Sequence, residues 1–147
     1  MDDGRETGQA EPGVLTAVRS CGSCRACCSV LGVRELEKPK WEACAHLCKH
    51  GCGIYEARPG SCANYVCGWL GGAYGANNST RPDHLGVIVD RPAPMGGQVL
   101  VREVWRGALA QRRVRELLIE AFRQGFTVVL DPFRGRRLPT GVPLVRP

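Results

Sequence analysis

The chain has 147 residues, a formal charge of +6 and only 9 aromatic side chains, against 29 glycines and prolines. Its length predicts one domain, and this composition predicts a modest core with many loops. Residues 1–20 lack the apolar run of a secretory signal, and no stretch approaches the roughly 20 apolar residues of a membrane span. We therefore expect a cytoplasmic protein without a membrane partner.

The charge is unevenly distributed. Residues 1–70 carry eight basic and eight acidic side chains, whereas residues 71–147 carry twelve arginines and six acidic side chains. A nucleic-acid surface normally combines a basic stripe with interleaved aromatic residues, and this sequence has no such stripe. A nucleic-acid partner is therefore not expected.

The first predicted segments are a leader and a cysteine module. Residues 1–18 are polar and glycine-containing, which predicts a flexible leader. Residues 19–70 predict a module of turns and short helical pieces that contains every cysteine of the chain: Cys21, Cys24, Cys27, Cys28, Cys44, Cys48, Cys52, Cys62 and Cys67.

The spacing of these thiols predicts a metal site. Two or three residues between cysteines let one turn present two sulfurs to the same ion, and the first three cysteines have a ferredoxin-like spacing. An odd number of cysteines and a reducing compartment argue against a disulfide framework. Eight thiolates suffice for two tetrahedral zinc sites, or for one four-iron cluster with four thiols left over. The spacing does not decide between zinc and an iron–sulfur cluster.

Neighbouring residues in the module could support such a centre. The side chains of Cys27 and Cys28 should point to different sides of the backbone, which favours two adjacent metal positions. His46 and His50 are alternative ligands if the segment is helical, or else exposed side chains. Arg58 could offset the charge of a thiolate cluster, with Tyr55 packed over it.

Residues 71–147 predict a small α+β part of the same domain, which begins with a connecting loop at 71–80. Residues 85–89 and 99–105 are rich in β-formers and predict an antiparallel hairpin. The apolar period from 114 to 122 predicts an amphipathic helix, with Gly125 at its C-terminal cap. Residues 126–130 predict a third strand. The expected fold class is α+β, with a loop-rich cysteine module packed on a small ββαβ layer.

Three segments together carry a family resemblance: Cys21-Gly-Ser-Cys-Arg-Ala-Cys-Cys28, Cys44-Ala-His-Leu47, and Gly51-Cys-Gly-Ile-Tyr-Glu-Ala-Arg-Pro-Gly-Ser-Cys62. Over residues 21–69 the chain resembles the YkgJ-type cysteine-cluster family, a CxxCxxCC domain associated with zinc or iron chelation. The resemblance implies metal ligation by Cys21, Cys24, Cys27, Cys28, Cys44, Cys52 and Cys62, with Cys67 as a companion. Cys48 is extra relative to the family pattern, and Ala45 stands where the family often has proline.

Three uses of the metal follow as hypotheses. The first is a small metal-binding protein with a redox or electron-transfer role. The second is a structural zinc module of a protein-interaction domain, and the third is an enzyme related to the flagellin lysine methylases, which contain similar cysteine clusters but are much longer. No catalytic residue can be named, because the sequence contains no Ser/His/Asp order, paired carboxylates or nucleotide fingerprint.

Overall fold

A computed structural model describes residues 20–73, 78–90 and 97–135. Four segments lie outside this part of the chain: the predicted leader, residues 74–77 of the connecting loop, residues 91–96 of the predicted hairpin, and the tail from residue 136. The helices are α1 (Ala26–Val30), α2 (Gly60–Asn64), α3 (Pro82–Leu85) and α4 (Arg112–Arg123). The strands are β1 (Leu47–Cys48), β2 (Gly51–Cys52), β3 (Val87–Val89), β4 (Gln98–Glu103) and β5 (Thr127–Asp131).

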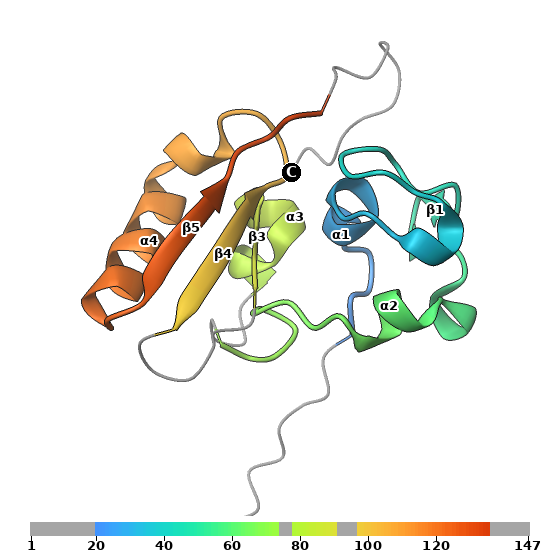
Figure 1. Cartoon of the computed structure of the whole chain (residues 1–147), viewed down its shortest axis with the longest axis horizontal. Coiled ribbons are helices and arrows are strands. Elements are labelled where there is room, and N and C mark those ends of the chain that lie inside the picture. Colours follow the sequence, from blue (N-terminus) through green and yellow to red (C-terminus); the bar gives the residue numbers. More distant parts are fainter. Residues whose placement is uncertain (1–19, 74–77, 91–96, 136–147) are drawn as a thin grey trace, which may run out of the picture.

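The C-terminal half forms a three-stranded sheet in the order β3-β4-β5. β3 pairs antiparallel with β4, and β5 pairs parallel with β4 through the crossover helix α4. This is the predicted ββαβ arrangement, so the mixed α+β fold class is confirmed. Figure 1 shows the sheet with α4 on one side and the cysteine module, which carries α1, α2 and β1, on the other.

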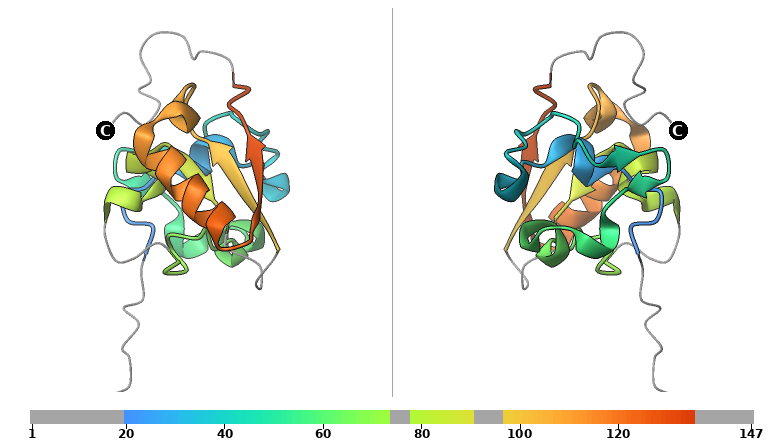
Figure 2. Two further views of the ribbon diagram at one scale, coloured as in Figure 1. Left: turned by 90° about the vertical axis from the view of Figure 1, so that its left-hand side faces the viewer. Right: turned by 90° about the vertical axis from the view of Figure 1, so that its right-hand side faces the viewer.

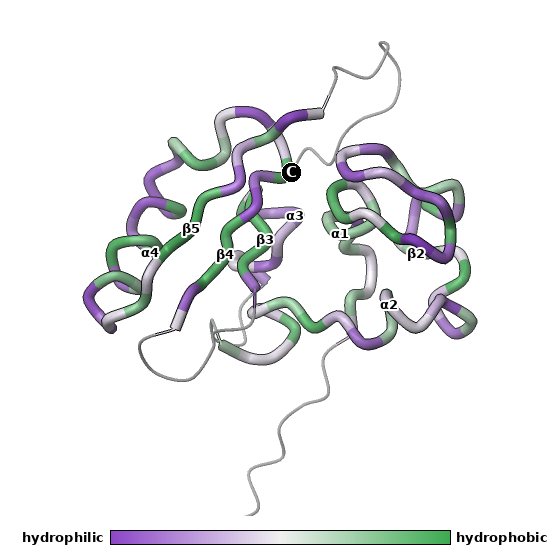
Figure 3. Tube along the Cα trace, in the orientation of Figure 1, coloured by the Kyte–Doolittle hydropathy of each residue, from purple (hydrophilic) through white to green (hydrophobic). Residues whose placement is uncertain are grey.

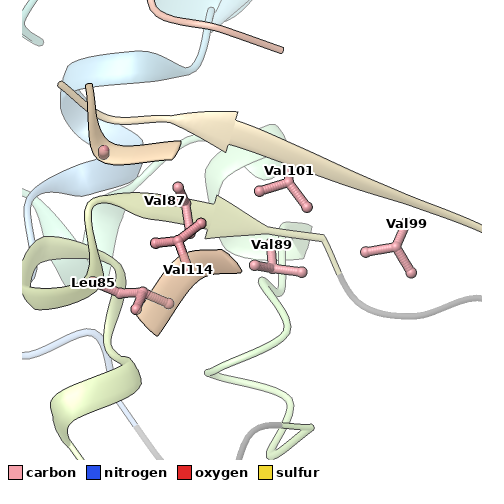
Figure 4. Close-up of a cluster of buried hydrophobic side chains, with 7 residues drawn as sticks. Leu85, Val87, Val89, Val99, Val101 and Val114 are labelled. Atoms are coloured by element: carbon pink, nitrogen blue, oxygen red, sulfur yellow. The ribbon is translucent and has the colours of Figure 1, made fainter. Parts of the chain in front are cut away.

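The main core lies between the sheet and α4. Successive side chains of a strand point to opposite faces, so alternate valines of β3 and β4 face the helix. Figure 4 shows this core, which consists of Leu85, Val87, Val89, Val99, Val101, Ala108 and Val114. The exposed surface of α4 is mostly polar but also carries Ile119 and Phe122. Figure 3 shows hydrophilic and hydrophobic residues alternating along the helix.

Two strand boundaries differ by two residues from the sequence prediction. The first strand begins at Val87 instead of residue 85, because Leu85 ends the short helix α3 and Gly86 follows it at φ +86°. A side chain at position 86 would meet the Trp105 ring and Ala108. Glycine is therefore required there twice, for its backbone conformation and for space. The second strand ends at Glu103, two residues earlier than predicted.

The cysteine module contains only short elements. α1 and α2 have five residues each, and β1 and β2 form a hairpin of two-residue strands. Gly51 in this hairpin has φ +118° and lies against the Gly22 carbonyl, which brings the hairpin onto the turn of the first cysteines. Figure 2 shows the module from the side opposite to α4.

A second buried cluster joins the module to the sheet. Ile88 of β3 points away from the α4 core and, with Val104, packs against Ala26 and Val30 of α1. The buried Cys24 belongs to the same cluster. One face of the sheet thus packs against α4, and the other packs against the cysteine module.

The longest described helix, α4, has 12 residues, and none of the helices in the described ranges is both long and apolar enough to cross a membrane.

Candidate metal centre

One cavity of about 280 Å³ lies between the cysteine module and the sheet. Eight of the nine cysteines line it: Cys21, Cys24, Cys27, Cys28, Cys44, Cys52, Cys62 and Cys67. These are the eight residues predicted as metal ligands from the sequence. The structure therefore brings the whole predicted set to one place, although the residues span 47 positions of the chain.

Local backbone structure determines how the first thiols are presented. The Cys24 N–H donates to the Cys21 carbonyl at 2.9 Å, closing a turn between the first two cysteines. Cys27 and Cys28 lie in α1, and the Cys44 N–H donates to the Cys28 carbonyl at 2.9 Å. The segment that carries Cys44 is therefore held against α1 by a main-chain hydrogen bond.

The last two thiols along the chain, those of Cys62 and Cys67, lie in different structural elements. Cys62 lies in α2, which follows Pro59. Cys67 forms a β-bridge with Asp90, next to β3, and its sulfur accepts a hydrogen bond from the Leu70 N–H at 3.5 Å. Of the eight thiols, Cys67 is thus the one attached to the sheet.

The remaining candidates lie outside the cavity lining. Cys48, His46 and His50 are exposed, and none of them lines the cavity. A helix over this segment, which the spacing of the histidines allows, would place both of them on one face. The structure has a β-hairpin instead, so the two histidines do not share a helical face.

The thiols share the cavity without converging on a point. Within the described residues, no group of three or more His, Cys, Asp or Glu side chains has the geometry of a metal site. The eight thiols of the cavity are suitable donors for a thiophilic metal. Their sulfur atoms would have to move closer together to bind an ion.

Burial keeps several of these thiols protonated. It raises the pKa of Cys24 to about 12, and it also raises the pKa of Cys21, Cys62 and Cys67. For Cys27, a hydrogen bond with the Cys28 side chain and then burial raise the pKa well above its ordinary value. Desolvation disfavours a thiolate unless positive charge is nearby, so thiolates here need a cation.

The other charged residues of the cavity are all basic. Four cations line it, Lys38, Lys40, Arg58 and Arg102, and none of the described residues lining it is Asp or Glu. Lys38 is 8 % exposed and donates through Nζ to the carbonyls of Leu31 and Pro39. The guanidinium of Arg58 lies 3.9 Å from the centre of the Tyr55 ring and interacts with the Cys21 thiol. Arg58 and Tyr55 thus both line the cavity beside the thiols.

Two polar clusters at the cavity wall were not predicted. Asp83 is buried behind Cys24 and accepts two hydrogen bonds from Arg81, at 2.6 and 2.7 Å. Arg81 also donates to the Ser23 hydroxyl at 3.1 Å, which links α3 to the module. A sequence signal for this cluster would have been the Arg-Pro-Asp order of residues 81–83, with Pro82 at the start of a helix.

In the second cluster, Asp90 accepts hydrogen bonds from Arg102 at 2.5 Å and from the Tyr65 hydroxyl at 2.8 Å. Arg102 lines the cavity from β4, and Tyr65 follows α2. The three residues therefore hold the segment between Cys62 and Cys67 against the sheet. They are far apart in sequence and have no common motif.

Comparison of the chain with protein-family models, curated proteins and solved structures gives no match in any of the three.

Proposed function

We propose that this chain is a small metal-binding protein that holds zinc or an iron–sulfur cluster through Cys21, Cys24, Cys27, Cys28, Cys44, Cys52, Cys62 and Cys67. The observation that carries the proposal is the content of the cavity: eight thiols, four basic side chains and, among its described lining residues, no carboxylate. Zinc and iron–sulfur centres are commonly bound by sets of thiolates.

Charge supports the same reading. Eight thiolates around two divalent ions would carry a net charge of −8 + 4 = −4, and four basic side chains line the cavity. Arg102 already pairs with Asp90 and Lys40 is exposed. Because a buried charge needs a partner, the buried Lys38 suits an anionic thiolate centre better than it suits free thiols. Eight thiols also exceed the four that one tetrahedral ion takes, which favours two adjacent ions or a cluster.

The test is elemental analysis of the full chain purified without oxygen, with an absorbance spectrum of the same sample. Iron with visible charge-transfer absorbance would support an iron–sulfur centre and a redox role. Zinc in a colourless sample would support a structural site. Purified protein that contains neither metal and does not take up either one would contradict the proposal.

Cys48 provides a matched control. Cys27→Ser removes a thiol that lines the cavity, and Cys48→Ser removes an exposed thiol outside it. We expect Cys27→Ser to lower the bound metal per chain and Cys48→Ser to leave it unchanged. Equal loss in the two variants would show that the cavity is not the binding site.

A further inference from the structure

One buried nitrogen in the wall of the thiol cavity has no hydrogen-bond partner. Among the residues that the structure describes, two buried side-chain nitrogens lack an acceptor, Trp41 Nε1 and Arg102 Nε. Of these two residues, Arg102 is the one that lines the cavity. A buried donor without an acceptor is destabilising, and such atoms are rare in native proteins. The Arg102 Nε–H therefore calls for an acceptor that the described residues do not supply.

The register of the sheet fixes the direction of the Arg102 side chain. Arg102 lies directly opposite Ile88 in the β3–β4 pair. Directly opposed residues point to the same face, and Ile88 packs against α1 of the cysteine module. Asp90 lies two residues after Ile88 and shares this face, as does Cys67, its partner in the β-bridge. Arg102, Asp90 and Cys67 therefore point to the side of the sheet on which Figure 1 shows the cysteine module.

Asp90 holds the guanidinium in this position. Arg102 Nη1 donates to Asp90 Oδ1 at 2.5 Å, and the Arg102 side chain is 16 % exposed. The Tyr65 hydroxyl donates to the same oxygen at 2.8 Å. Burial is the largest cause of the raised pKa of Tyr65; the hydrogen bond and the Cys67 thiol raise it further, whereas Arg102 lowers it. Because both residues act on one hydroxyl, the guanidinium and the Cys67 thiol lie near each other.

Cys67 is the cavity thiol that suits this donor. A metal-bound cysteine is a thiolate, and a thiolate accepts a charge-assisted hydrogen bond far better than a neutral thiol does. The Cys67 sulfur already accepts from the Leu70 N–H at 3.5 Å, and burial raises the pKa of this thiol. A buried thiolate needs further donors or positive charge nearby. The Arg102 guanidinium supplies both.

We infer that Arg102 is a positioning residue of the metal centre, whose Nε–H donates to the Cys67 thiolate and orients that sulfur toward the bound ion. The inference rests on the proposed function, because the acceptor is a thiolate that forms on metal binding. Asp90 already keeps the guanidinium in place, so little further ordering is needed when an ion binds. Donors that hold a metal ligand in this way contribute about 10–100-fold to metal affinity.

The experiment compares the wild-type chain with Arg102→Lys, which keeps the positive charge beside Asp90 but lacks the Nε–H. Each protein is purified without oxygen, and bound metal per chain is measured over a chelator series. We expect Arg102→Lys to release half of its metal at an about 10–100-fold lower chelator concentration. Arg112→Lys is the matched control, because Arg112 also forms one ion pair, with Glu116, but is exposed and outside the cavity lining. It should release metal as the wild type does.

A second measurement separates this role from a purely structural one. In excess chelator, Arg102→Lys should unfold at the same denaturant concentration as the wild type, because the Nε–H has no acceptor among the described residues to lose. Equal metal release by the two proteins would overturn the inference. A loss of stability in excess chelator that accounts for the weaker metal binding would overturn it as well. A wild-type chain that holds no metal would instead contradict the proposed function.

A double-mutant cycle tests whether Arg102 acts through Cys67. Cys67→Ser should itself weaken metal retention, and adding Arg102→Lys should then have little further effect, because the acceptor is already gone. If the two substitutions weaken retention independently, Arg102 has another acceptor and the inference is wrong. Should Arg102→Lys fail to fold, the Arg102 Nε–H resonance of the wild-type chain decides. We expect it to be protected from exchange after loading with Zn²⁺ and unprotected in excess chelator, and equal exchange in the two states would overturn the inference.

Discussion

The two halves of the molecule are stabilised by different means. Of the seven largest fully buried side chains, six belong to the sheet half, and Val30 is the one from the cysteine module. The sheet half has a 12-residue helix and a three-stranded sheet, whereas the module has helices of five residues and strands of two. Short elements without a large apolar core are unstable alone. The module therefore depends on its packing against the sheet and, in our proposal, on metal ligation.

The largest expected effect comes from metal removal, which should destabilise the cysteine module much more than the sheet half. A structural metal can contribute about 10–16 kcal/mol of apparent binding free energy, comparable with the stability of a whole domain. With a strong chelator, hydrogen exchange should become fast over residues 20–70 and remain slow in β3, β4 and α4. Equal loss of protection in both halves would show that the cysteine module does not depend on the metal more than the sheet half does.

The next effect tests the close packing of the sheet half. Gly86→Ala should lower the free energy of unfolding by about 2–5 kcal/mol, the sum of an unfavourable left-handed backbone and overpacking against Trp105. Gly107 has φ +89° and open space around it, so Gly107→Ala isolates the backbone contribution of about 1–2 kcal/mol. Thermal or denaturant unfolding measures both variants, and equal losses would show that the Trp105 contact is unimportant.

A smaller effect is expected at the junction of the two halves. Asp83→Asn removes a buried negative charge that accepts two hydrogen bonds from Arg81, and should cost about 1–3 kcal/mol. Glu35 is the control, because its exposed carboxylate also accepts two hydrogen bonds, both from Ser61. Denaturant unfolding should show no change for Glu35→Gln. Equal destabilisation of the two variants would mean that burial of Asp83 is not the cause.

The smallest effect is expected for Tyr65→Phe. It removes the 2.8 Å hydrogen bond to Asp90 but leaves the ring and the Arg102–Asp90 pair, so the expected cost is about 0.5–1.5 kcal/mol. The measurement is again denaturant unfolding, combined with metal content. A loss of metal without a loss of stability would instead give this hydroxyl a role at the centre.

The sequence predicted the sheet half better than the cysteine module, because the helix and strands of the sheet half have local sequence signals. The apolar period of residues 114–122 and the β-rich runs predicted α4, β3, β4 and β5 to within one or two residues. The short helix α3 was missed, because its four residues leave too little periodicity to recognise. The β1–β2 hairpin was missed because two-residue strands depend on the Gly51–Gly22 contact, which is not a local signal.

The same distinction applies to the candidate site. Cysteine spacing predicted a thiol site, because ligands close in sequence are held by single turns, and the family resemblance singled out the eight cysteines that line the cavity. The Tyr65–Asp90–Arg102 cluster and the Arg81–Ser23 hydrogen bond join segments up to 58 residues apart. No spacing rule connects such residues, so only the tertiary structure reveals them.

The attachment of Cys67 to the sheet has a consequence for how the centre would assemble. The Gly68 N–H donates to the Val89 carbonyl at 2.7 Å, so this thiol is positioned by β3, while the other cavity cysteines lie in turns and loops, in five-residue helices or in the two-residue strand β2. The folded sheet can thus present one sulfur in place before any ion arrives. In the proposed centre, an incoming ion would bind there first and then recruit the remaining ligands, and β3 would serve as the template for assembly.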